Sequence, residues 1–319
     1  MAASLLLRLL GLLLILTSVG IALSRAPDRP VQTLVARWAP PPSDFIEVKG
    51  QLVHLRDEGP RSDPAPLLLL HGTGASLHTW DGWAAALKAH KRVIRIDLPG
   101  FGLTGPFSGQ YASDDYRGDT YARFVLDVMA ALGLSRAAIG GNSLGGEIAW
   151  RAATLAPQRF AQLILVDATG YAFTPDDIPL GLRIARIPVL ARIGEYLLPR
   201  AVVAASLRSV YGDPARIGDE LIDRTFELTL REGNRRALGL RLQQLEADVH
   251  AERIKTLALP TLVLWGGRDR LVPLANGERF AAEIRGAKLV VFDALGHVPQ
   301  EEDPARTVAV VTDFLENRP

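Results

Sequence analysis

Cysteine is absent from this chain of 319 residues, and lysine is scarce. Without cysteine the chain has no disulfide, no thiol nucleophile and no thiolate-ligated zinc, although this absence assigns no compartment. Only five of the 36 basic residues are lysines, the arginines are scattered, and the formal net charge is +1. Binding to a nucleic-acid duplex requires concentrated lysine and arginine, so nucleic acid is excluded as a main partner.

Internal repeats are also absent, and the one compositionally biased stretch is rich in proline. With 48% hydrophobic and 22% charged residues, the composition is globular and the chain is long enough for one large core. We expect an N-terminal apolar segment at residues 1–24 and a Pro-rich linker at 25–44. A core in two parts, 45–170 and 255–319, then encloses a helical insertion at 171–254.

The N-terminal segment has one charged interruption. Residues 9–23 carry no charge, and Arg8 separates them from three further leucines. About 20 apolar residues span a bilayer, a length reached only if Arg8 lies within the span with its charge at the membrane surface. We expect an uncleaved membrane anchor and membrane contact through this segment. The alternative is a cleaved signal, with small residues at 22–24, and a secreted or periplasmic protein.

Apolar runs and helical segments alternate through most of the remaining chain. A predicted β-hairpin at residues 45–56 comes first. Runs typical of buried strands follow at residues 66–70, 92–97, 137–139, 162–167, 260–265 and 287–292. Such alternation predicts a parallel sheet covered on both faces. Residues 171–253 break the pattern with helices separated by turns, and an insertion there would form a lid over the carboxyl ends of the strands.

One stretch combines a strand, a tight turn and a helix around a serine. Residues 141–145 are Gly-Asn-Ser-Leu-Gly, between the apolar run 137–139 and a helical segment at 146–153. In this setting Gly-x-Ser-x-Gly is typical of a nucleophile elbow, in which the serine hydroxyl projects from a strained turn. Glycines flank the serine because a Cβ would collide with the adjacent strand or helix. The pattern predicts Ser143 as a nucleophile, and a glycine-rich turn that only packs or holds a phosphate is the alternative.

A serine hydroxyl needs a positioned base to take its proton. In enzymes with such an elbow the acid and then the base follow the serine in the chain, which leaves His250 and His297. His250 lies in a polar helical segment, where a surface role is expected. His297 follows the apolar run 287–292 in a loop, and loops at the carboxyl edge of a parallel sheet gather catalytic groups. We therefore expect His297 to be the base.

The acid that orients this histidine has two candidates. Asp269 follows the apolar run 260–265 after a Gly-Gly turn, and Asp167 ends the run that follows the elbow. Both lie between Ser143 and His297 in the chain, as the acid should. The Gly-Gly turn favours Asp269 because it allows the side chain to fold back toward the histidine loop.

Two backbone N–H groups are needed to stabilise the oxyanion of an acyl-transfer reaction. One should belong to Leu144, directly after the nucleophile. The other should come from the loop His-Gly-Thr-Gly at residues 71–74, where Thr73 is the candidate. This loop lacks the patterns of the common phosphate-binding loops, so phosphate binding is the weaker interpretation.

In these features the chain resembles the α/β-hydrolase superfamily over roughly residues 45–318. The segments that carry the resemblance are 71–74, 97–102 (Asp-Leu-Pro-Gly-Phe-Gly), 141–146, 267–269 (Gly-Arg-Asp) and 296–297 (Gly-His). The resemblance implies an α/β-hydrolase fold with a mostly parallel eight-stranded sheet, helices on both faces and a helical cap inserted after the sixth strand. It also implies a Ser143–Asp269–His297 triad, an oxyanion hole at Thr73 and Leu144, and no requirement for a metal or organic cofactor.

Within the superfamily, the chain looks like the capped branch that includes esterases and C–C bond hydrolases. Members that dehalogenate or open epoxides use an aspartate nucleophile, so Ser143 argues against both activities. The resemblance implies hydrolysis of a carboxylic ester or similar carbonyl substrate through an acyl-enzyme. We expect a small hydrophobic acyl substrate, because a membrane anchor would suit hydrophobic esters. A non-hydrolytic accessory or binding protein, an acyltransferase and a C–C bond hydrolase remain alternatives. The insertion at 171–254 holds twelve arginines and twelve acidic residues, so it predicts no charge preference. Oligomeric state is not predicted.

Overall fold

An eight-stranded sheet forms the centre of the molecule. The computed structural model describes residues 2–174, 178–245 and 248–316. The strand order is β1-β2-β4-β3-β5-β6-β7-β8; β2 pairs antiparallel with β1 and β4, and all other neighbours are parallel. The strands are β1 (Ser43–Val48), β2 (Gln51–Glu58), β3 (Leu67–Leu70), β4 (Val93–Ile96), β5 (Ala137–Asn142), β6 (Phe160–Val166), β7 (Thr261–Gly266) and β8 (Lys288–Phe292). This confirms the mostly parallel sheet that the resemblance implies.

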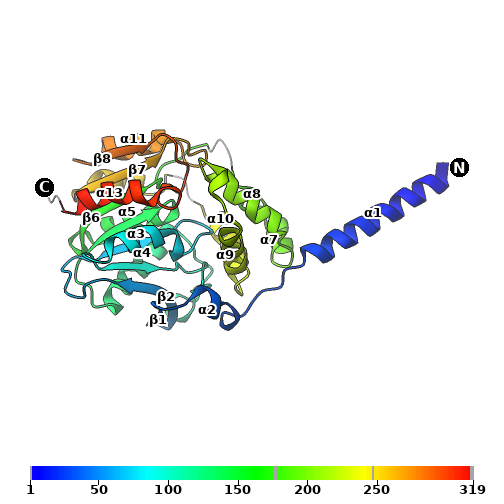
Figure 1. The fold of residues 1–319 in the computed structure, drawn as a ribbon, viewed down its shortest axis with the longest axis horizontal. Coiled ribbons are helices and arrows are strands. Elements are labelled where there is room, and N and C mark those ends of the chain that lie inside the picture. Colours follow the sequence, from blue (N-terminus) through cyan, green and yellow to red (C-terminus); the bar gives the residue numbers. More distant parts are fainter. Residues whose placement is uncertain (1, 175–177, 246–247, 317–319) are drawn as a thin grey trace.

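Helices cover both faces of the sheet (Figure 1). On one face lie α3 (Asp81–Leu87) and α13 (Pro304–Glu316), and on the other lie α4 (Gly118–Ala131), α5 (Leu144–Leu155) and α11 (Leu274–Glu283). Strand β3 shows why its sequence is continuously apolar. Leu67 and Leu69 belong to the core on the α3 side, whereas Leu68 and Leu70 belong to the core on the α4 side. A central parallel strand is buried on both faces, so every position is apolar.

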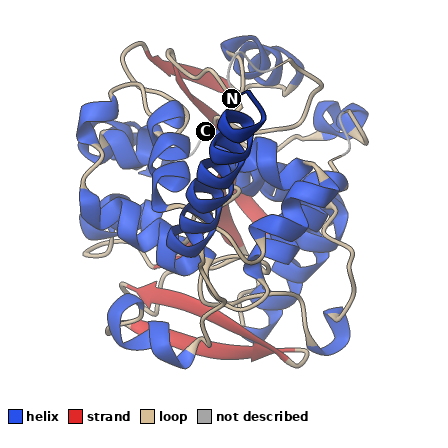
Figure 2. Ribbon diagram, turned by 90° about the vertical axis from the view of Figure 1, so that its right-hand side faces the viewer, coloured by secondary structure: helices blue, strands red, loops and turns tan. Residues whose placement is uncertain are grey.

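The predicted helical insertion lies between β6 and β7. It consists of α6 (Leu180–Arg186), α7 (Pro188–Gly194), α8 (Arg200–Val210), α9 (Asp219–Thr229) and α10 (Asn234–Gln243). We call these five helices the cap. Figure 1 shows the cap at one end of the sheet, and Figure 2 shows the same helices face-on behind the N-terminal helix. The expected cap after the sixth strand is confirmed.

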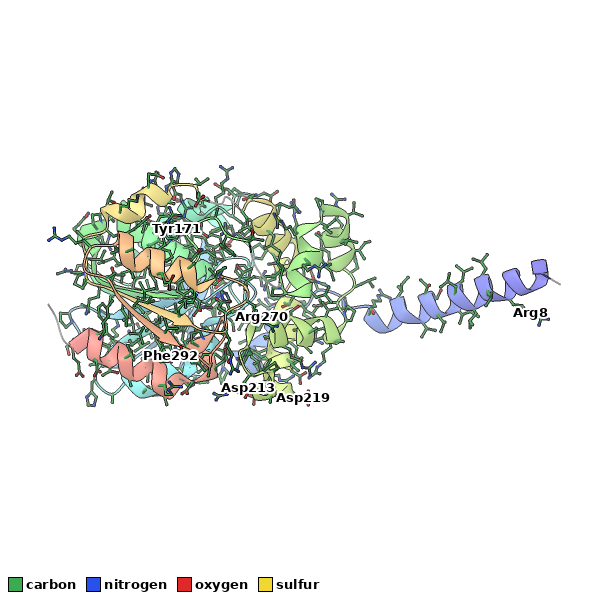
Figure 3. The ribbon with its side chains drawn as sticks, turned by 90° about the horizontal axis from the view of Figure 1, so that it is seen from above. Arg8, Tyr171, Asp213, Asp219, Arg270 and Phe292 are labelled. Carbon is green, nitrogen blue, oxygen red and sulfur yellow. The ribbon has the colours of Figure 1, made fainter. Side chains whose placement is uncertain are left out.

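The expectation of a membrane anchor is wrong. Residues 2–24 form a helix, α1 (Ala2–Ser24), that projects away from the rest of the molecule, with Arg8 near its far end (Figure 3). In the described part of the chain, no helix has both the length and the apolar character needed to cross a membrane. The physical reason is the one charge near the start of the segment. Arg8 and Arg25 limit the charge-free run to residues 9–24, short of the roughly 20 residues that a bilayer requires.

Residues 25–44, expected as a Pro-rich linker, include a helix that packs against the rest of the molecule. It contains the short helix α2 (Gln32–Trp38), whose buried residues Leu34 and Trp38 share one face and pack with Leu103 and Leu228. The Trp38 indole N–H also donates a 2.6 Å hydrogen bond to Glu227 of α9. Two apolar residues four positions apart are enough to give a single helical turn a face that packs. This segment therefore contacts the cap through α2.

Candidate active site

The elbow around Ser143 has the strained geometry that its sequence predicts. Ser143 alone connects β5 to α5, and its backbone adopts φ 54° and ψ −115°, which non-glycine residues rarely occupy. A Cβ on Gly141 would collide with the backbone of Gly145, and a Cβ on Gly145 would collide with the backbone of Leu70. Both glycines are therefore required by the close approach of the elbow to its own helix and to β3. Conformations of this kind cost roughly 1–3 kcal/mol and cluster at functional sites.

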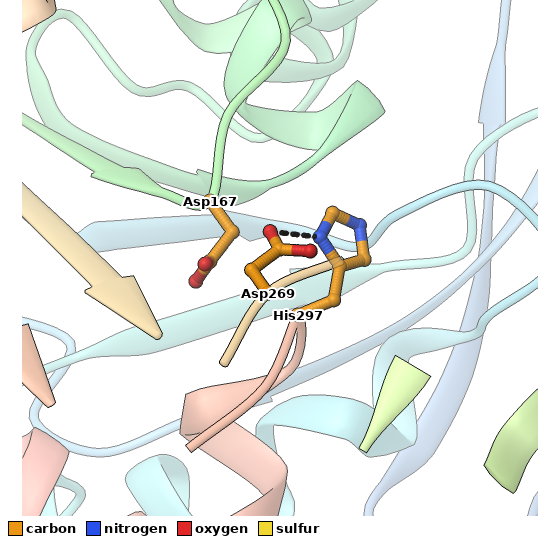
Figure 4. A group of neighbouring side chains, drawn as sticks. All are labelled: Asp167, Asp269 and His297. Atoms are coloured by element: carbon orange, nitrogen blue, oxygen red, sulfur yellow. Dashed lines mark hydrogen bonds and ion pairs between the residues drawn. The ribbon is translucent and has the colours of Figure 1, made fainter. Parts of the chain in front are cut away.

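His297 and Asp269 form a buried pair. His297 Nδ1 donates a 2.7 Å hydrogen bond to Asp269 Oδ2, as Figure 4 shows. The other oxygen, Asp269 Oδ1, accepts hydrogen bonds from the backbone N–H groups of Leu271 at 2.8 Å and Val272 at 3.0 Å. The carboxylate orientation is thus set by three donors. With Nδ1 protonated, Nε2 of His297 is left as a proton acceptor.

The second acid candidate, Asp167, lies beside this pair without bonding to the imidazole. It follows β6, is fully buried, and has φ 43°. Its Oδ1 accepts a 2.9 Å hydrogen bond from the N–H of Gly266 at the end of β7. Burial, with the neighbouring Asp269 as the second cause, raises the pKa of the Asp167 carboxyl well above its usual range. Of the two acids that the sequence leaves open, the structure pairs Asp269 with His297.

The main chain of His297 is fixed from two directions. Asn142 Nδ2, from the residue before Ser143, donates a 2.9 Å hydrogen bond to the His297 carbonyl and a second, of 3.2 Å, to the Val166 carbonyl. The His297 N–H donates to the carbonyl of Val210, at the end of cap helix α8, at 2.8 Å. Asn142 is therefore a site residue that sequence reasoning missed, although it lies inside the elbow motif.

The predicted oxyanion donors flank the serine. Leu144 is the first residue of α5, and the first N–H groups of a helix have no intrahelical acceptor. Thr73 lies in the loop after β3, which contacts the elbow closely: a Cβ on Gly72 would lie 2.9 Å from Asn142 Oδ1 and 3.2 Å from Ser143 Cβ. This places the Thr73 loop directly against Ser143.

A cavity of about 490 Å³ lies between the sheet and the cap, and Thr73, Ser143 and His297 line it. This volume is within the range of roughly 300–1,000 Å³ that is usual for small-molecule sites. The cap contributes mainly aliphatic side chains to its wall, among them Leu182, Val203, Leu207, Leu228, Leu238 and Leu242. The cavity is therefore polar at the strand ends and apolar under the cap.

Four arginines with low exposure in the cavity wall are each paired with a carboxylate, and Arg235 pairs with Asp28. Glu147 on α5 accepts hydrogen bonds from Arg241 at 2.7 Å and from Arg151 at 3.0 Å. Arg224 on α9 donates to Glu301 at 2.9 Å. A charge that is already paired in a protein interior gains little from a charged ligand and opposes its own displacement. The inner wall therefore favours an uncharged ligand.

A buried glutamate joins the histidine loop to the cap. Glu302, in α12 (Pro299–Glu302), accepts a 2.6 Å hydrogen bond from the Gly296 N–H through Oε1. Its Oε2 accepts from the N–H groups of Gly212 at 2.9 Å and Asp213 at 3.3 Å, just after cap helix α8. Burial raises the pKa of Glu302, although these backbone donors act in the opposite direction. No motif in the sequence marks this residue.

Side chains of the types that bind metal ions lie close together around His297. In the part of the chain that the structure describes, one group of three such side chains, Asp167, Asp269 and His297, has ligand atoms within 4.8 Å of one another. Both oxygens of Asp269 and Nδ1 of His297 are already engaged in hydrogen bonds. The arrangement fits a hydrogen-bond network better than a coordination site. The other histidine after the elbow, His250, lies beyond α10 near Asp119, outside this group.

Comparison with known proteins places these observations in a family. Residues 67–310 match the model described as "Alpha/beta hydrolase family". An uncharacterised protein of Mycobacterium tuberculosis is 30% identical over 300 residues, covering 90% of this chain and 84% of the relative. A meta-cleavage product hydrolase structure from Pseudomonas fluorescens has a TM-score of 0.72 at 28% identity, covering 86% of this chain and 97% of its own. A membrane phospholipase A structure has a TM-score of 0.70 at 25% identity, covering 99% of this chain and 96% of its own.

Proposed function

The chain belongs to the alpha/beta hydrolase family, and on this premise we propose that it is a serine hydrolase of carboxylic esters with an apolar acyl group. One observation carries the proposal. Ser143 and His297, which is paired with Asp269, lie at the polar end of a cavity whose far wall is aliphatic. A nucleophile, a positioned base and an apolar binding wall are the parts that this reaction needs.

The geometry supports the following sequence of steps. His297 Nε2 takes the proton of Ser143, and the serine oxygen attacks the ester carbonyl carbon. The N–H groups of Leu144 and Thr73 stabilise the oxyanion that forms. The imidazolium then protonates the departing alcohol, which leaves an acyl group on Ser143. Water, deprotonated by His297, attacks this acyl-enzyme and releases the carboxylic acid, while Asp269 stays ionised throughout.

The neutral inner wall of the cavity supports an uncharged acyl group. Arg151, Arg224 and Arg241 are all paired with carboxylates, so a substrate carboxylate would have to displace an existing partner. Aliphatic side chains of the cap would instead contact an alkyl or aryl group. Similarity to a phospholipase A, an enzyme whose name denotes ester hydrolysis, is in line with this choice.

Cleavage of a C–C bond next to a carbonyl group is the second candidate, favoured by the similarity to a meta-cleavage product hydrolase. The two activities differ in the bond that breaks after Ser143 or a His297-activated water attacks the carbonyl. A direct comparison of kcat/KM for an ester panel and for a meta-cleavage product separates them. Faster turnover of the ring-cleavage product would reject the ester proposal.

The deciding experiment combines a probe with a substrate series. A fluorophosphonate should label the wild-type protein at Ser143 and should not label Ser143→Ala. With p-nitrophenyl esters of increasing chain length, kcat/KM should rise about fourfold per added methylene until the cavity is filled, because each buried CH₂ contributes about 0.8 kcal/mol. Labelling without turnover of any ester would favour an acyl acceptor other than water. The absence of both labelling and turnover would favour a binding protein.

A further inference from the structure

Two buried carboxyl groups lie next to each other and close to the imidazole of His297. Asp167 and Asp269 follow the neighbouring parallel strands β6 and β7, so the strand ends bring them together. Their side chains are shielded from solvent, and their carboxylate oxygens lie within 4.8 Å of each other and of an imidazole nitrogen of His297. Figure 4 shows the three side chains grouped in this way. Two ionised carboxylates so close together and away from water repel each other strongly.

The hydrogen bonds show which of the two carries the charge. Asp269 accepts from the imidazole of His297 and from two backbone N–H groups, and three such donors stabilise an ionised carboxylate. Asp167 accepts from a single backbone N–H, that of Gly266. Its Oδ2 is buried without a hydrogen-bond partner among the described residues. A buried, ionised oxygen with no donor is costly, whereas the same oxygen can donate once it is protonated.

We propose that Asp167 is a protonated carboxylic acid in the folded enzyme and donates a hydrogen bond to the ionised carboxylate of Asp269. This inference rests on the proposed function, because it makes Asp167 a positioning residue for the Asp269–His297 pair. The proton has two effects. It adds a fourth donor to Asp269, and it leaves one negative charge beside His297 instead of two.

The surroundings of Asp167 agree with this assignment. The charged or titratable groups that act on it are Asp269 and, more weakly, Glu302, both of which oppose its ionisation. Its burial acts in the same direction and is the largest cause of the raised pKa of its carboxyl. His297 lies within the same group but is hydrogen-bonded to Asp269. The Gly266 N–H favours the ionised form and is the one opposing contact.

The test uses two substitutions that the backbone tolerates. Asp167 has φ 43°, a left-handed conformation that asparagine and glycine adopt readily. Asp167→Asn keeps a neutral side chain that can accept from Gly266 and donate to Asp269. Asp167→Gly removes the side chain altogether. Asp293→Asn, an exposed aspartate in the same loop as His297, serves as the matched control.

Infrared spectroscopy reads the protonation state without substrate. At neutral pH the wild-type protein should show the carbonyl stretch of a protonated carboxylic acid, and Asp167→Asn should lose this band. Asp293→Asn should retain it. A spectrum in which Asp167→Asn loses only ionised carboxylate absorption would overturn the proposal.

Kinetics then test the positioning role. Asp167→Asn should keep the wild-type pH dependence of kcat/KM, whereas Asp167→Gly should lower kcat about tenfold with little change in KM, as expected when a charged group loses one hydrogen bond. If Asp167 were ionised in the wild type, Asp167→Asn would remove a negative charge near His297. The acidic limb of the pH profile of kcat/KM would then move to lower pH, which would refute the inference.

The proposed function can fail separately. Loss of the infrared band in Asp167→Asn, with no ester turnover by any variant, would reject the proposed function and still support a protonated Asp167.

Discussion

The cavity has two walls, one at the strand ends and one formed by the cap, and their side chains are held in place differently. At the strand ends, hydrogen bonds fix the carboxylate of Asp269 to two backbone N–H groups, the imidazole of His297 to Asp269, and the main chain of His297 to Asn142 and Val210. Under the cap, the wall consists mainly of aliphatic side chains, which cannot form such bonds. Chemistry requires atoms at set distances, whereas apolar recognition requires only shape and area. Substitutions at the strand ends should therefore change rates for all substrates, and substitutions in the cap should change which substrates are used.

The two walls are nevertheless connected. The Val210 carbonyl of α8 binds the His297 N–H, and Glu302 binds Gly296 of the histidine loop and Gly212 of the cap together. A movement of the cap at residues 210–213 is therefore transmitted to the loop that carries the proposed base. Substitutions in the cap should therefore leave the proposed catalytic residues unaffected only where they do not disturb these contacts.

The largest expected effect is the loss of the nucleophile. Ser143→Ala should reduce kcat for every ester by about 10⁴-fold or more, since a catalytic serine acts as a unit with its base. Folding should be unchanged, as measured by circular dichroism and thermal melting, because alanine lacks only one oxygen. Ser135→Ala, at an exposed serine before β5, is the control. Substantial ester turnover by purified Ser143→Ala would show that the strand-end wall is not the catalytic one.

The difference between the walls also explains what could be predicted from the sequence. Ser143, Asp269 and His297 occur in short local patterns after apolar runs, and the structure places them at the ends of the expected strands. The contacts of Glu302 could not be found in this way, because Gly212 lies 90 positions earlier in the chain. Which cap side chains face the cavity depends on how five short helices pack, and no local pattern encodes that. The anchor prediction is wrong because the apolar run is interrupted by a charge at Arg8.

A substitution of Glu302 should remove the hydrogen bonds that connect the two walls. Glu302→Ala leaves the N–H groups of Gly296 and Gly212 without their acceptor, and each unsatisfied buried donor costs roughly 1–3 kcal/mol. We expect kcat for short esters to fall roughly 10- to 100-fold, because the histidine loop loses its support. Glu278→Ala, an exposed glutamate of α11, controls for helix effects.

Glu302→Gln sharpens this test, since glutamine keeps the shape but presents an amide where one N–H needs an acceptor. It should fall between the wild type and Glu302→Ala in kcat. Equal kcat for all three proteins would mean that the histidine loop holds its position without the cap.

A substitution in the apolar wall should separate substrates by length. Leu207→Trp places a larger side chain in the cavity from α8 and should lower kcat/KM for long-chain esters about tenfold, the effect of losing roughly two buried methylenes. Acetate esters should be hydrolysed as before, because the strand-end residues are untouched. Val189→Trp, at a position of α7 that is 70% exposed, is the matched control. A uniform loss across all chain lengths would contradict the division of roles between the walls.

The smallest effect on activity is expected from Asp167→Asn, which should instead change how stability depends on pH. Unfolded aspartate ionises near pH 4, whereas burial keeps Asp167 protonated to higher pH in the folded protein. Above pH 4 the folded state thus binds more protons than the unfolded state, so wild-type stability falls as pH rises through this window.

Asparagine removes this dependence. The stability of Asp167→Asn relative to wild type should be constant below pH 4 and then increase by up to about 1.4 kcal/mol per pH unit, until the raised pKa of Asp167 is reached. Urea unfolding between pH 3.5 and 8 measures the difference, with Asp293→Asn in parallel. If the difference in unfolding free energy between Asp167→Asn and the wild type stays constant over this range, Asp167 ionises at the same pH in the folded and unfolded states. The strand-end wall would then hold two negative charges beside His297.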